Sequence, residues 1–255
     1  MKTTRITVIV ALGAALAQPA WAIVGGGSAA PETIAHAVVT VVGSRGNFCT
    51  GALIAPDLVL TAAHCVLPGA TYKIVDYGAD KSPKLLDTRN VAAHPSFSLP
   101  TLLGHRATAD VALLQLAAPA PSGKVPATTG LPQIPIEVGA RFTVAGMGVS
   151  VRGDGRSGGV IRAASLVATG QPGTLQIRLV DVLTQGARDG LGACTGDSGA
   201  PVFEDQEGRA VVIGLVSWST GPNNSAGCGG LTGVTPLTLY RDWILKTARA
   251  WGTRI

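Results

Sequence analysis

The amino-acid sequence predicts an all-β protein, and composition and pattern both support this. Of the 255 residues, 34 are glycine and only 14% are charged, whereas an average soluble domain has about 7% glycine and about 25% charged residues. Short apolar segments alternate with turns rich in glycine and proline, which is typical of barrels and sandwiches built from short strands. A chain of this length can form one domain or two.

Six apolar segments have the length and composition of β-strands. They are residues 37–42, 53–60, 111–116, 142–145, 175–180 and 211–216. Only residues 236–251 have helical spacing, with Leu239, Trp243 and Ile244 on one face. The proline-rich stretch 117–135 is the best candidate for a linker between two halves of the chain.

The first 22 residues predict a secretory signal peptide. Lys2 and Arg5 form a basic start, residues 6–17 are apolar, and Ala20-Trp21-Ala22 ends the segment with small residues around one large one. The apolar run is too short to span a membrane, and no later stretch is long enough. We therefore expect a chain of residues 23–255 that is secreted, extracellular or periplasmic, and free of the membrane once the signal is removed.

The charge of the chain does not indicate a nucleic-acid partner. The formal net charge is +5, and it becomes +3 when the signal peptide takes away Lys2 and Arg5. No basic cluster interleaved with aromatic residues is present in the sequence. No Cys-x-x-Cys or His-x-x-x-His spacing occurs, so we expect no metal site and no cofactor.

The segment Cys194-Thr195-Gly196-Asp197-Ser198 continues as Gly-Ala-Pro and places a serine between glycines. A serine hydroxyl is a weak nucleophile until a base takes its proton, and the charge that develops on the substrate oxygen needs fixed donors. A glycine at 196 has no Cβ to block its backbone amide. The same residue types also favour ordinary turns, so this motif alone leaves a purely structural turn open.

His64 and Asp110 are the residues that a nucleophilic serine would need as partners. His64 lies in the segment TAAHC at 61–65, and Asp110 directly precedes the apolar run VALLQL at 111–116. A lone histidine is more often a surface or core residue, but a carboxylate at the start of a buried strand is costly unless it is paired. We expect Asp110 to pair with His64, as a Ser–His–carboxylate relay requires.

Taken together, these motifs resemble the chymotrypsin/trypsin family of serine endopeptidases. Five segments match in the family's order, and a closing helix follows around Trp243: IVGG at 23–26, TAAHC at 61–65, DVALL at 110–114, GDSGAP at 196–201 and SW at 217–218. The resemblance implies two six-stranded antiparallel β-barrels, about residues 23–125 and 126–255, with the active site in the cleft between them. It also implies a protein or peptide substrate, and we expect a monomer.

The resemblance assigns a role to each catalytic candidate. Ser198 would be the nucleophile, His64 the general base and acid, and Asp110 the carboxylate that orients the imidazole. The backbone amides of Gly196 and Ser198 would form the oxyanion hole.

The same resemblance places the substrate pocket. Its floor would lie six residues before the nucleophile, at Gly192, with Ala193 beside it. Its walls would be formed by Ser217, Trp218, Ser219 and Gly233. Trypsin-like members carry an aspartate at the floor, whereas neither Gly192 nor Ala193 can pair with a cation, so we expect an uncharged residue at the cleaved position. His105 would lie in a loop bordering the cleft, with at most a minor part in binding.

The four cysteines of a secreted chain allow up to two disulfides and three connectivities. The resemblance selects two pairs, Cys49 with Cys65 and Cys194 with Cys228. It also implies that a freed amino group of Ile23 pairs with Asp197. Because Ala22 precedes Ile23, and Lys2 and Arg5 are the only basic residues upstream, we expect signal peptidase to make that terminus.

Two other functions remain as alternatives. An esterase of the α/β-hydrolase type would need Gly-x-Ser-x-Gly, but Ala200 occupies the last position and the alternating helices of that fold are missing. A catalytically inactive family member acting as a binding protein would usually lack one of the three catalytic residues, and all three are present here.

Overall fold

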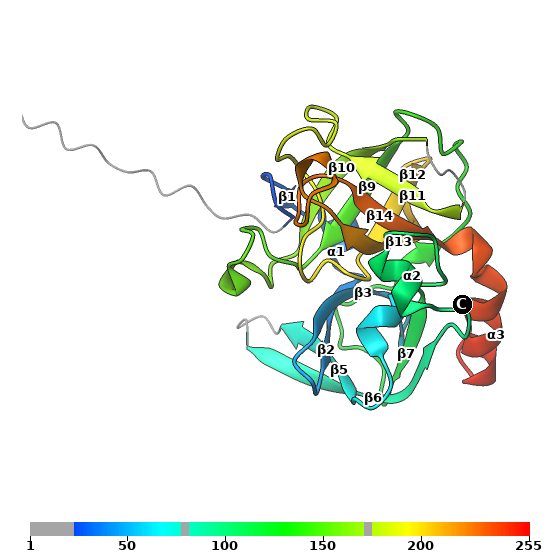
Figure 1. Ribbon diagram of the computed structural model, residues 1–255. Helices are drawn as coiled ribbons and strands as arrows, with labels where there is room; N and C mark the ends of the chain where they lie inside the picture. Colours follow the sequence, from blue (N-terminus) through cyan, green and yellow to red (C-terminus); the bar gives the residue numbers. More distant parts are fainter. Residues whose placement is uncertain (1–22, 78–81, 171–174) are drawn as a thin grey trace, which may run out of the picture.

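The computed structural model describes residues 23–77, 82–170 and 175–255. Two antiparallel β-barrels lie side by side, with a helix near the C-terminus along one side of the molecule (Figure 1). The expected all-β fold of two six-stranded barrels is therefore confirmed.

The first barrel is closed in the strand order β2-β3-β4-β7-β6-β5. Its strands are β2 (Val38–Gly43), β3 (Phe48–Ala55), β4 (Leu58–Thr61), β5 (Tyr72–Tyr77), β6 (Pro83–Ala93) and β7 (Ala112–Leu116). Apolar side chains from these strands, including Val41, Leu53, Ile74 and Leu114, fill the interior and are almost fully buried. Closure leaves no unpaired strand edge in this barrel.

The second barrel closes because both β10 and β12 pair with β9. Its strands are β9 (Arg141–Gly146), β10 (Arg162–Ala168), β11 (Ile177–Val180), β12 (Pro201–Gln206), β13 (Arg209–Ser219) and β14 (Thr232–Pro236). Two short strands extend the sheet: β1 (Ser28–Ala29) pairs with β10, and β8 (Thr128–Thr129) pairs with β13. Ile23 lies in the core of this barrel, so residues 23–29 pack on the second barrel.

Few helices accompany the barrels. In the described ranges the α-helices are α1 (Glu32–Ala35), α2 (Leu99–Leu103) and α3 (Arg241–Ala250), and 3₁₀ helices include Ala63–Val66, Gly155–Ser157, Pro222–Asn224 and Leu237–Leu239. Ile244 and Ala248 of α3 join an apolar cluster that holds residues of both barrels, among them Leu113 and Leu215. This shared cluster packs the two barrels together.

The expected strands and the expected helix are present, and one correction applies to a strand and one to the helix. The predicted strand 53–60 is a hairpin of β3 and β4, because Pro56 has no N–H donor and a two-residue turn at 56–57 reverses the chain. The predicted helix 236–251 begins only at Arg241, after the 3₁₀ helix Leu237–Leu239. Leu239 is therefore about half exposed and does not share the buried face with Ile244.

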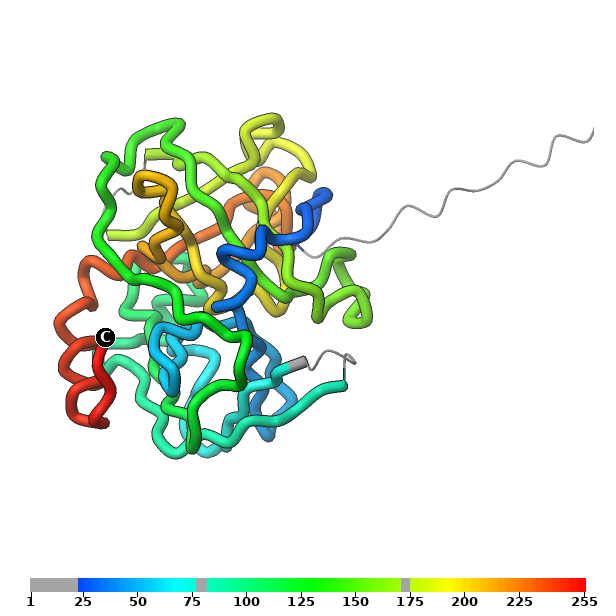
Figure 2. Tube along the Cα trace, turned by 180° about the vertical axis from the view of Figure 1, so that it is seen from behind, coloured from blue at the N-terminus to red at the C-terminus, as the bar shows by residue number. Residues whose placement is uncertain are grey.

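Strands β5, β6, β10, β12 and β14 did not stand out in the sequence. In β6 the half-buried face carries the polar Thr88 and Asn90, and the exposed face carries the apolar Leu85 and Val91, so apolar and polar residues do not alternate as in a half-buried strand. The proline-rich stretch 117–135 does connect the two barrels. Within it, Ala127 N–H donates to Leu53 O, and Figure 2 shows this green segment running along the outside from the first barrel to the second.

Candidate active site

Two neighbouring strands of the first barrel bring His64 and Asp110 together. β4 and β7 pair in a register that places Thr61 opposite Ala112. His64 follows β4 in the 3₁₀ helix Ala63–Val66, and Asp110 lies just before β7. Two residues that are 46 positions apart in the sequence thus meet at one end of the strand pair.

The carboxylate of Asp110 is fully buried and accepts three hydrogen bonds. The His64 Nδ1–H donates to Oδ2 at 2.8 Å, and the backbone N–H of His64 donates to Oδ1 at 3.0 Å. The hydroxyl of Ser217, which belongs to the second barrel, donates to Oδ2 at 2.6 Å. Because a carboxylate accepts hydrogen bonds, Nδ1–H is the donor in this pair, and Nε2 is the ring nitrogen that remains for a second partner.

Residues 194–199, here called the oxyanion loop, form a tight turn ahead of β12. The Asp197 N–H donates to Cys194 O at 3.0 Å, and the Gly199 N–H donates to Val216 O at 2.7 Å. Gly196 has a φ of +94°, and a Cβ there would lie 2.8 Å from the Phe48 ring. No residue in the described part of the chain accepts from the amides of Gly196 and Ser198, so both remain free for a ligand.

Ser198 and His64 lie against the same disulfide sulfur, that of Cys65. Cys65 Sγ is 3.8 Å from His64 Nε2 and 3.8 Å from the Ser198 carbonyl oxygen. The structure records no hydrogen bond from the Ser198 hydroxyl to any residue that it describes. Catalytic hydrogen bonds are often long before substrate binds and shorten only in the complex.

Asp197 is fully buried in surroundings built from glycine. Its carboxylate accepts from Gly148 N at 2.8 Å and from Cys194 N at 2.9 Å. A Cβ at Gly148 would lie 2.6 Å from the carboxyl carbon, so only glycine fits there. Burial raises the pKa of Asp197 to about 7, and the two amide donors oppose that rise.

The other expected activation residue, Ile23, is also fully buried, in the core of the second barrel. The next residue, Val24, pairs with Gly192, whose N–H donates to Val24 O at 3.3 Å. In the chain described here the Ile23 nitrogen is a peptide amide and carries no charge.

The expected pocket residues lie together around the indole of Trp218. A Cβ at Gly233 would lie 2.1 Å from a Trp218 ring carbon, so the ring fills the space beside that glycine. His105 stacks on the indole with ring centroids 4.6 Å apart, and the Arg178 guanidinium lies 5.6 Å from the ring centroid. The neighbouring Ser219 hydroxyl donates to the Gly227 carbonyl at 3.2 Å.

Ala193, expected with Gly192 at the pocket floor, is joined to this wall through Thr232, which lies opposite Ser219 in the pairing of β13 with β14. A Cβ at Gly192 would lie 3.1 Å from the Gly229 Cα, and the Ala193 N–H donates to Thr232 Oγ1 at 3.0 Å. Neither residue carries a charge that could pair with a cation.

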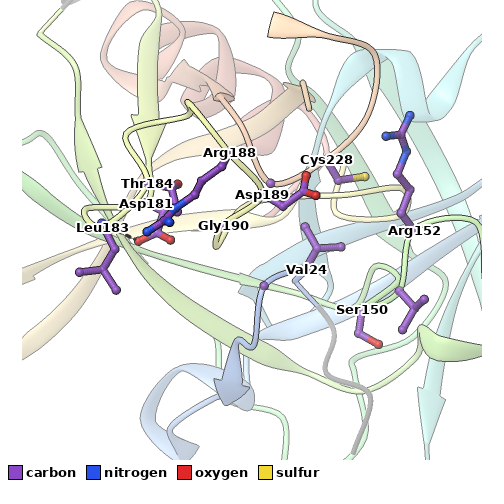
Figure 3. Close-up of a pocket in the computed structure, with 13 residues that line it drawn as sticks. Val24, Ser150, Arg152, Asp181, Leu183, Thr184, Arg188, Asp189, Gly190 and Cys228 are labelled. Carbon is purple, nitrogen blue, oxygen red and sulfur yellow. Dashed lines mark hydrogen bonds between the residues drawn. The ribbon is translucent and has the colours of Figure 1, made fainter. Parts of the chain in front are cut away.

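A cavity lies beside Val24 and Gly25, among the loops that hold residues 150–152, 181–190 and 228–229. Its volume is about 700 Å³, and Figure 3 shows Val24, Arg152, Asp181 and Asp189 among its lining side chains. Apart from Cys228, none of the residues expected at the active site or the pocket lines it.

The expected disulfides are both formed, Cys49 with Cys65 and Cys194 with Cys228. The first joins β3 to the helical turn that carries His64, and the second holds the start of the oxyanion loop. The sulfurs of Cys49 and Cys65 lie with a His64 nitrogen inside 4.8 Å. This group is not a metal centre, because sulfurs joined in a disulfide are not thiolates.

Two contributors to the site were not recognised in the sequence. Ser217 was expected in the pocket wall, whereas its hydroxyl holds Asp110. Thr50 was not singled out at all, yet it hydrogen-bonds to the oxyanion loop. A polar residue inside the otherwise apolar segment 49–55 is the one signal that could have marked it.

The two-barrel fold and the Asp110–His64 pair beside a Gly-Asp-Ser-Gly turn define the class of two-barrel serine proteases. The comparison with family models agrees with this class. The family model described as Trypsin matches residues 23–244, so the chain belongs to the trypsin family of serine proteases.

Characterised relatives cover most of the chain. Trypsin from Sus scrofa is 27% identical over 242 residues, 89% of this chain and 96% of that protein. Brachyurin from Leptuca pugilator is 27% identical over 235 residues, and the match covers 87% of this chain and 96% of that protein. Serine protease 56 from Homo sapiens is 30% identical over 254 residues, and the match covers 91% of this chain but only 40% of the human protein.

Solved structures show the same fold. Human heparin binding protein superposes with a TM-score of 0.66 at 27% identity, covering 87% of this chain and 95% of that chain. A mutant of the same protein superposes with a TM-score of 0.66 at 25% identity, covering 87% of this chain and 94% of that chain.

Of the helices in the described ranges, none has both the length and the apolar character needed to cross a bilayer.

The raised pKa of Asp197 predicts a pH-dependent stability for chains in which Ile23 is not the first residue. An unfolded aspartate ionises near pH 3.8 and the folded one near 7, so the folded state holds an extra proton between these values. Its stability should therefore fall as pH rises from about 4 to about 7, by at most roughly 4 kcal/mol. The expected pairing of a freed Ile23 ammonium with Asp197 would remove this loss in a chain that starts at Ile23.

Urea unfolding of chains starting at Ala20 and at Ile23, measured from pH 4 to pH 7.5, tests the expectation. Asp197→Asn in the longer chain is the control and should remove the trend. A difference in stability between the two chains that stays constant with pH would contradict it.

Proposed function

We propose that this protein is a secreted serine endopeptidase that hydrolyses peptide bonds through an acyl-enzyme formed on Ser198. The observation that carries the proposal is the buried Asp110 carboxylate, bonded to His64 Nδ1 at 2.8 Å, with the Ser198 turn beside the same imidazole. Family membership supports a protein or peptide as the substrate.

Acylation begins when a substrate carbonyl lies over Ser198. His64 Nε2 takes the hydroxyl proton as Oγ attacks the carbonyl carbon, and the carbonyl oxygen becomes an oxyanion. The free amides of Gly196 and Ser198 donate to that oxygen. His64 then gives its proton to the amine nitrogen, the C–N bond breaks, and an ester to Ser198 remains.

Deacylation repeats these steps with water. His64 takes a proton from the water as its oxygen attacks the ester carbon, and a second oxyanion forms at the same amides. Collapse breaks the bond to Ser198, which recovers its proton from His64. Asp110, held by three donors, keeps the imidazole in place and stabilises the imidazolium in both halves.

A binding function is the second candidate, because two of the similar solved structures are named for heparin binding. Retention of Ser198, His64 and Asp110 favours catalysis over binding alone. An esterase would share the acyl-enzyme, and hydrolysis of an amide bond separates the two.

We also propose that removal of the signal peptide activates the enzyme. Cleavage after Ala22 would turn the Ile23 nitrogen into an ammonium, and Ile23 and Asp197 are both buried in the second barrel. That cation would stabilise ionised Asp197 and with it the oxyanion loop. Two disulfides are consistent with an exported, oxidising location.

Replacement of either catalytic residue should abolish activity while leaving the fold intact. We expect Ser198→Ala and His64→Ala to lower kcat on a peptide amide by several orders of magnitude, up to about 10⁶-fold. A fluorophosphonate probe should label the wild type and fail to label Ser198→Ala. Ser96→Ala and His36→Ala are matched controls away from the site and should keep wild-type rates.

The protease proposal is wrong if correctly processed wild type is not labelled, or if labelling survives in Ser198→Ala. If wild type is labelled and cleaves esters but no peptide amide, the esterase alternative stands.

The uncharged pocket floor predicts that cleavage does not favour Lys or Arg. Profiling on a peptide library should show preference for an uncharged side chain, because Gly192 and Ala193 offer no carboxylate. Gly192→Asp supplies one and should raise relative cleavage after Lys and Arg. A strong wild-type preference for these residues would show that the pocket is assigned wrongly.

The activation proposal predicts the amino terminus of the active enzyme. Edman sequencing of secreted, active protein should begin at Ile23, and Ile-Val-Gly-Gly should be read first. A different start, or full activity with the signal peptide still attached, would rule this activation out.

A further inference from the structure

Thr50 is bonded to the oxyanion loop and its surroundings through every polar group that it has. It lies in β3 directly after Cys49 and is fully buried. Its hydroxyl donates to the Gly196 carbonyl at 2.8 Å and accepts from the Met147 N–H at 3.1 Å. Its own N–H donates to Ser198 O at 2.9 Å, and its carbonyl accepts from the Thr61 hydroxyl at 2.7 Å.

We propose that Thr50 is a positioning residue for the oxyanion hole, and that its hydroxyl holds the Gly196 amide in the orientation catalysis needs. This inference rests on the proposed protease function and adds to it a residue outside the triad. Thr50 acts through Gly196 and touches no reacting atom.

Gly196 needs such a restraint because of its own freedom. It sits at φ +94°, a region open to glycine and costly for other residues, and glycine also populates many other conformations. Its N–H must face the substrate oxygen while its carbonyl lies on the protein side. The Gly196 N–H lies in the peptide plane of the Thr195 carbonyl, which accepts from the Val149 N–H at 2.9 Å, and the Gly196 carbonyl lies in the next plane, which the Thr50 hydroxyl holds. The two bonds together restrict rotation about the glycine Cα and so fix the direction of the amide.

The buried setting makes the hydroxyl hard to replace. The Thr50 hydroxyl donates to the Gly196 carbonyl and at the same time accepts from the Met147 N–H. A hydroxyl can do both at once, whereas a methyl group can do neither. Removing it leaves two buried polar groups without partners, and the loop must shift to satisfy them.

The same hydroxyl closes a ring of contacts around Asp197. Met147 adjoins Gly148, whose N–H donates to Asp197 Oδ1 at 2.8 Å. Thr50 therefore connects the carbonyl on one side of Asp197 with the segment that holds the Asp197 carboxylate. Both ends of the turn that presents Ser198 are held to the first barrel by one residue, since the Thr50 hydroxyl holds Gly196 O and the Thr50 backbone N–H holds Ser198 O.

The test compares Thr50→Val, which keeps the branched shape and loses the hydroxyl, with Thr50→Ser, which keeps the hydroxyl. Thr40→Val is the matched control, because Thr40 is equally buried in the first barrel and its hydroxyl donates to the Met147 sulfur at 2.9 Å rather than to the loop backbone. Thermal unfolding of all three reports stability separately from rate.

We expect Thr50→Val to lower kcat on a peptide amide by about 10- to 100-fold, with KM within about twofold of wild type. Loss of a whole oxyanion donor costs about 10²- to 10³-fold, and a misdirected donor should cost less. Interactions made only in the transition state appear in kcat and not in KM. Thr50→Ser should stay within about threefold of wild type, and Thr40→Val within about twofold.

The pH dependence of kcat/KM should keep its wild-type midpoint in Thr50→Val, because Thr50 bonds to neither His64 nor Asp110. A shifted midpoint would mean that the triad is disturbed and would overturn the assignment. So would a Thr50→Val kcat within threefold of wild type, a loss carried by KM, or a loss in Thr50→Ser equal to that in Thr50→Val. If Thr50→Val does not fold, Thr50→Ala replaces it under the same criteria.

Failure of this inference is distinguishable from failure of the proposed function. An active, probe-labelled wild type together with an equally active Thr50→Val overturns only the role of Thr50. A correctly processed wild type that neither hydrolyses peptides nor reacts with a fluorophosphonate overturns the protease proposal itself.

Discussion

The burial of the Asp110 carboxylate between the two barrels is the constraint on which the site depends. A charge without solvent must be paired and hydrogen-bonded to be tolerated. Its donors come from both barrels, since His64 belongs to the first and Ser217 to the second. The pairing therefore fixes the imidazole and also favours one relative placement of the barrels, which the apolar cluster shared by both supports.

Asp197 is the contrasting case, because it is as deeply buried but far less well compensated. Two backbone amides donate to it, and burial still raises its pKa to about 7. Glycines around it leave no room for a further side chain. Under the proposed activation, breaking one peptide bond before Ile23 supplies the missing cation. In this proposal Asp110 finds its partners in the fold itself, whereas Asp197 finds its cation only after processing.

The sequence predicted what depends on local pattern and on motifs. The apolar strands and the Asp110–His64 pair follow from burial and spacing, and the two barrels and the disulfide pairs follow from the family resemblance. Strand β6 was missed because polar Thr88 and Asn90 occupy its half-buried face and apolar Leu85 and Val91 its exposed face. The role of Thr50 could not be predicted, because its hydroxyl bonds to Gly196, 146 positions away, and nothing in the local sequence specifies that contact.

The oxyanion loop illustrates why such distant contacts matter for catalysis. Its six residues carry glycine at 196 and 199 and would be mobile in isolation. Four separate parts of the chain hold it: Thr50 from β3, Gly148 and Val149 from the segment after β9, Val216 from β13, and Cys228 through a disulfide. Each restrains a different atom, so none can replace another. Donors aimed at a developing charge help only if they are fixed before the reaction, and the loop obtains that rigidity from its neighbours rather than from its own residues.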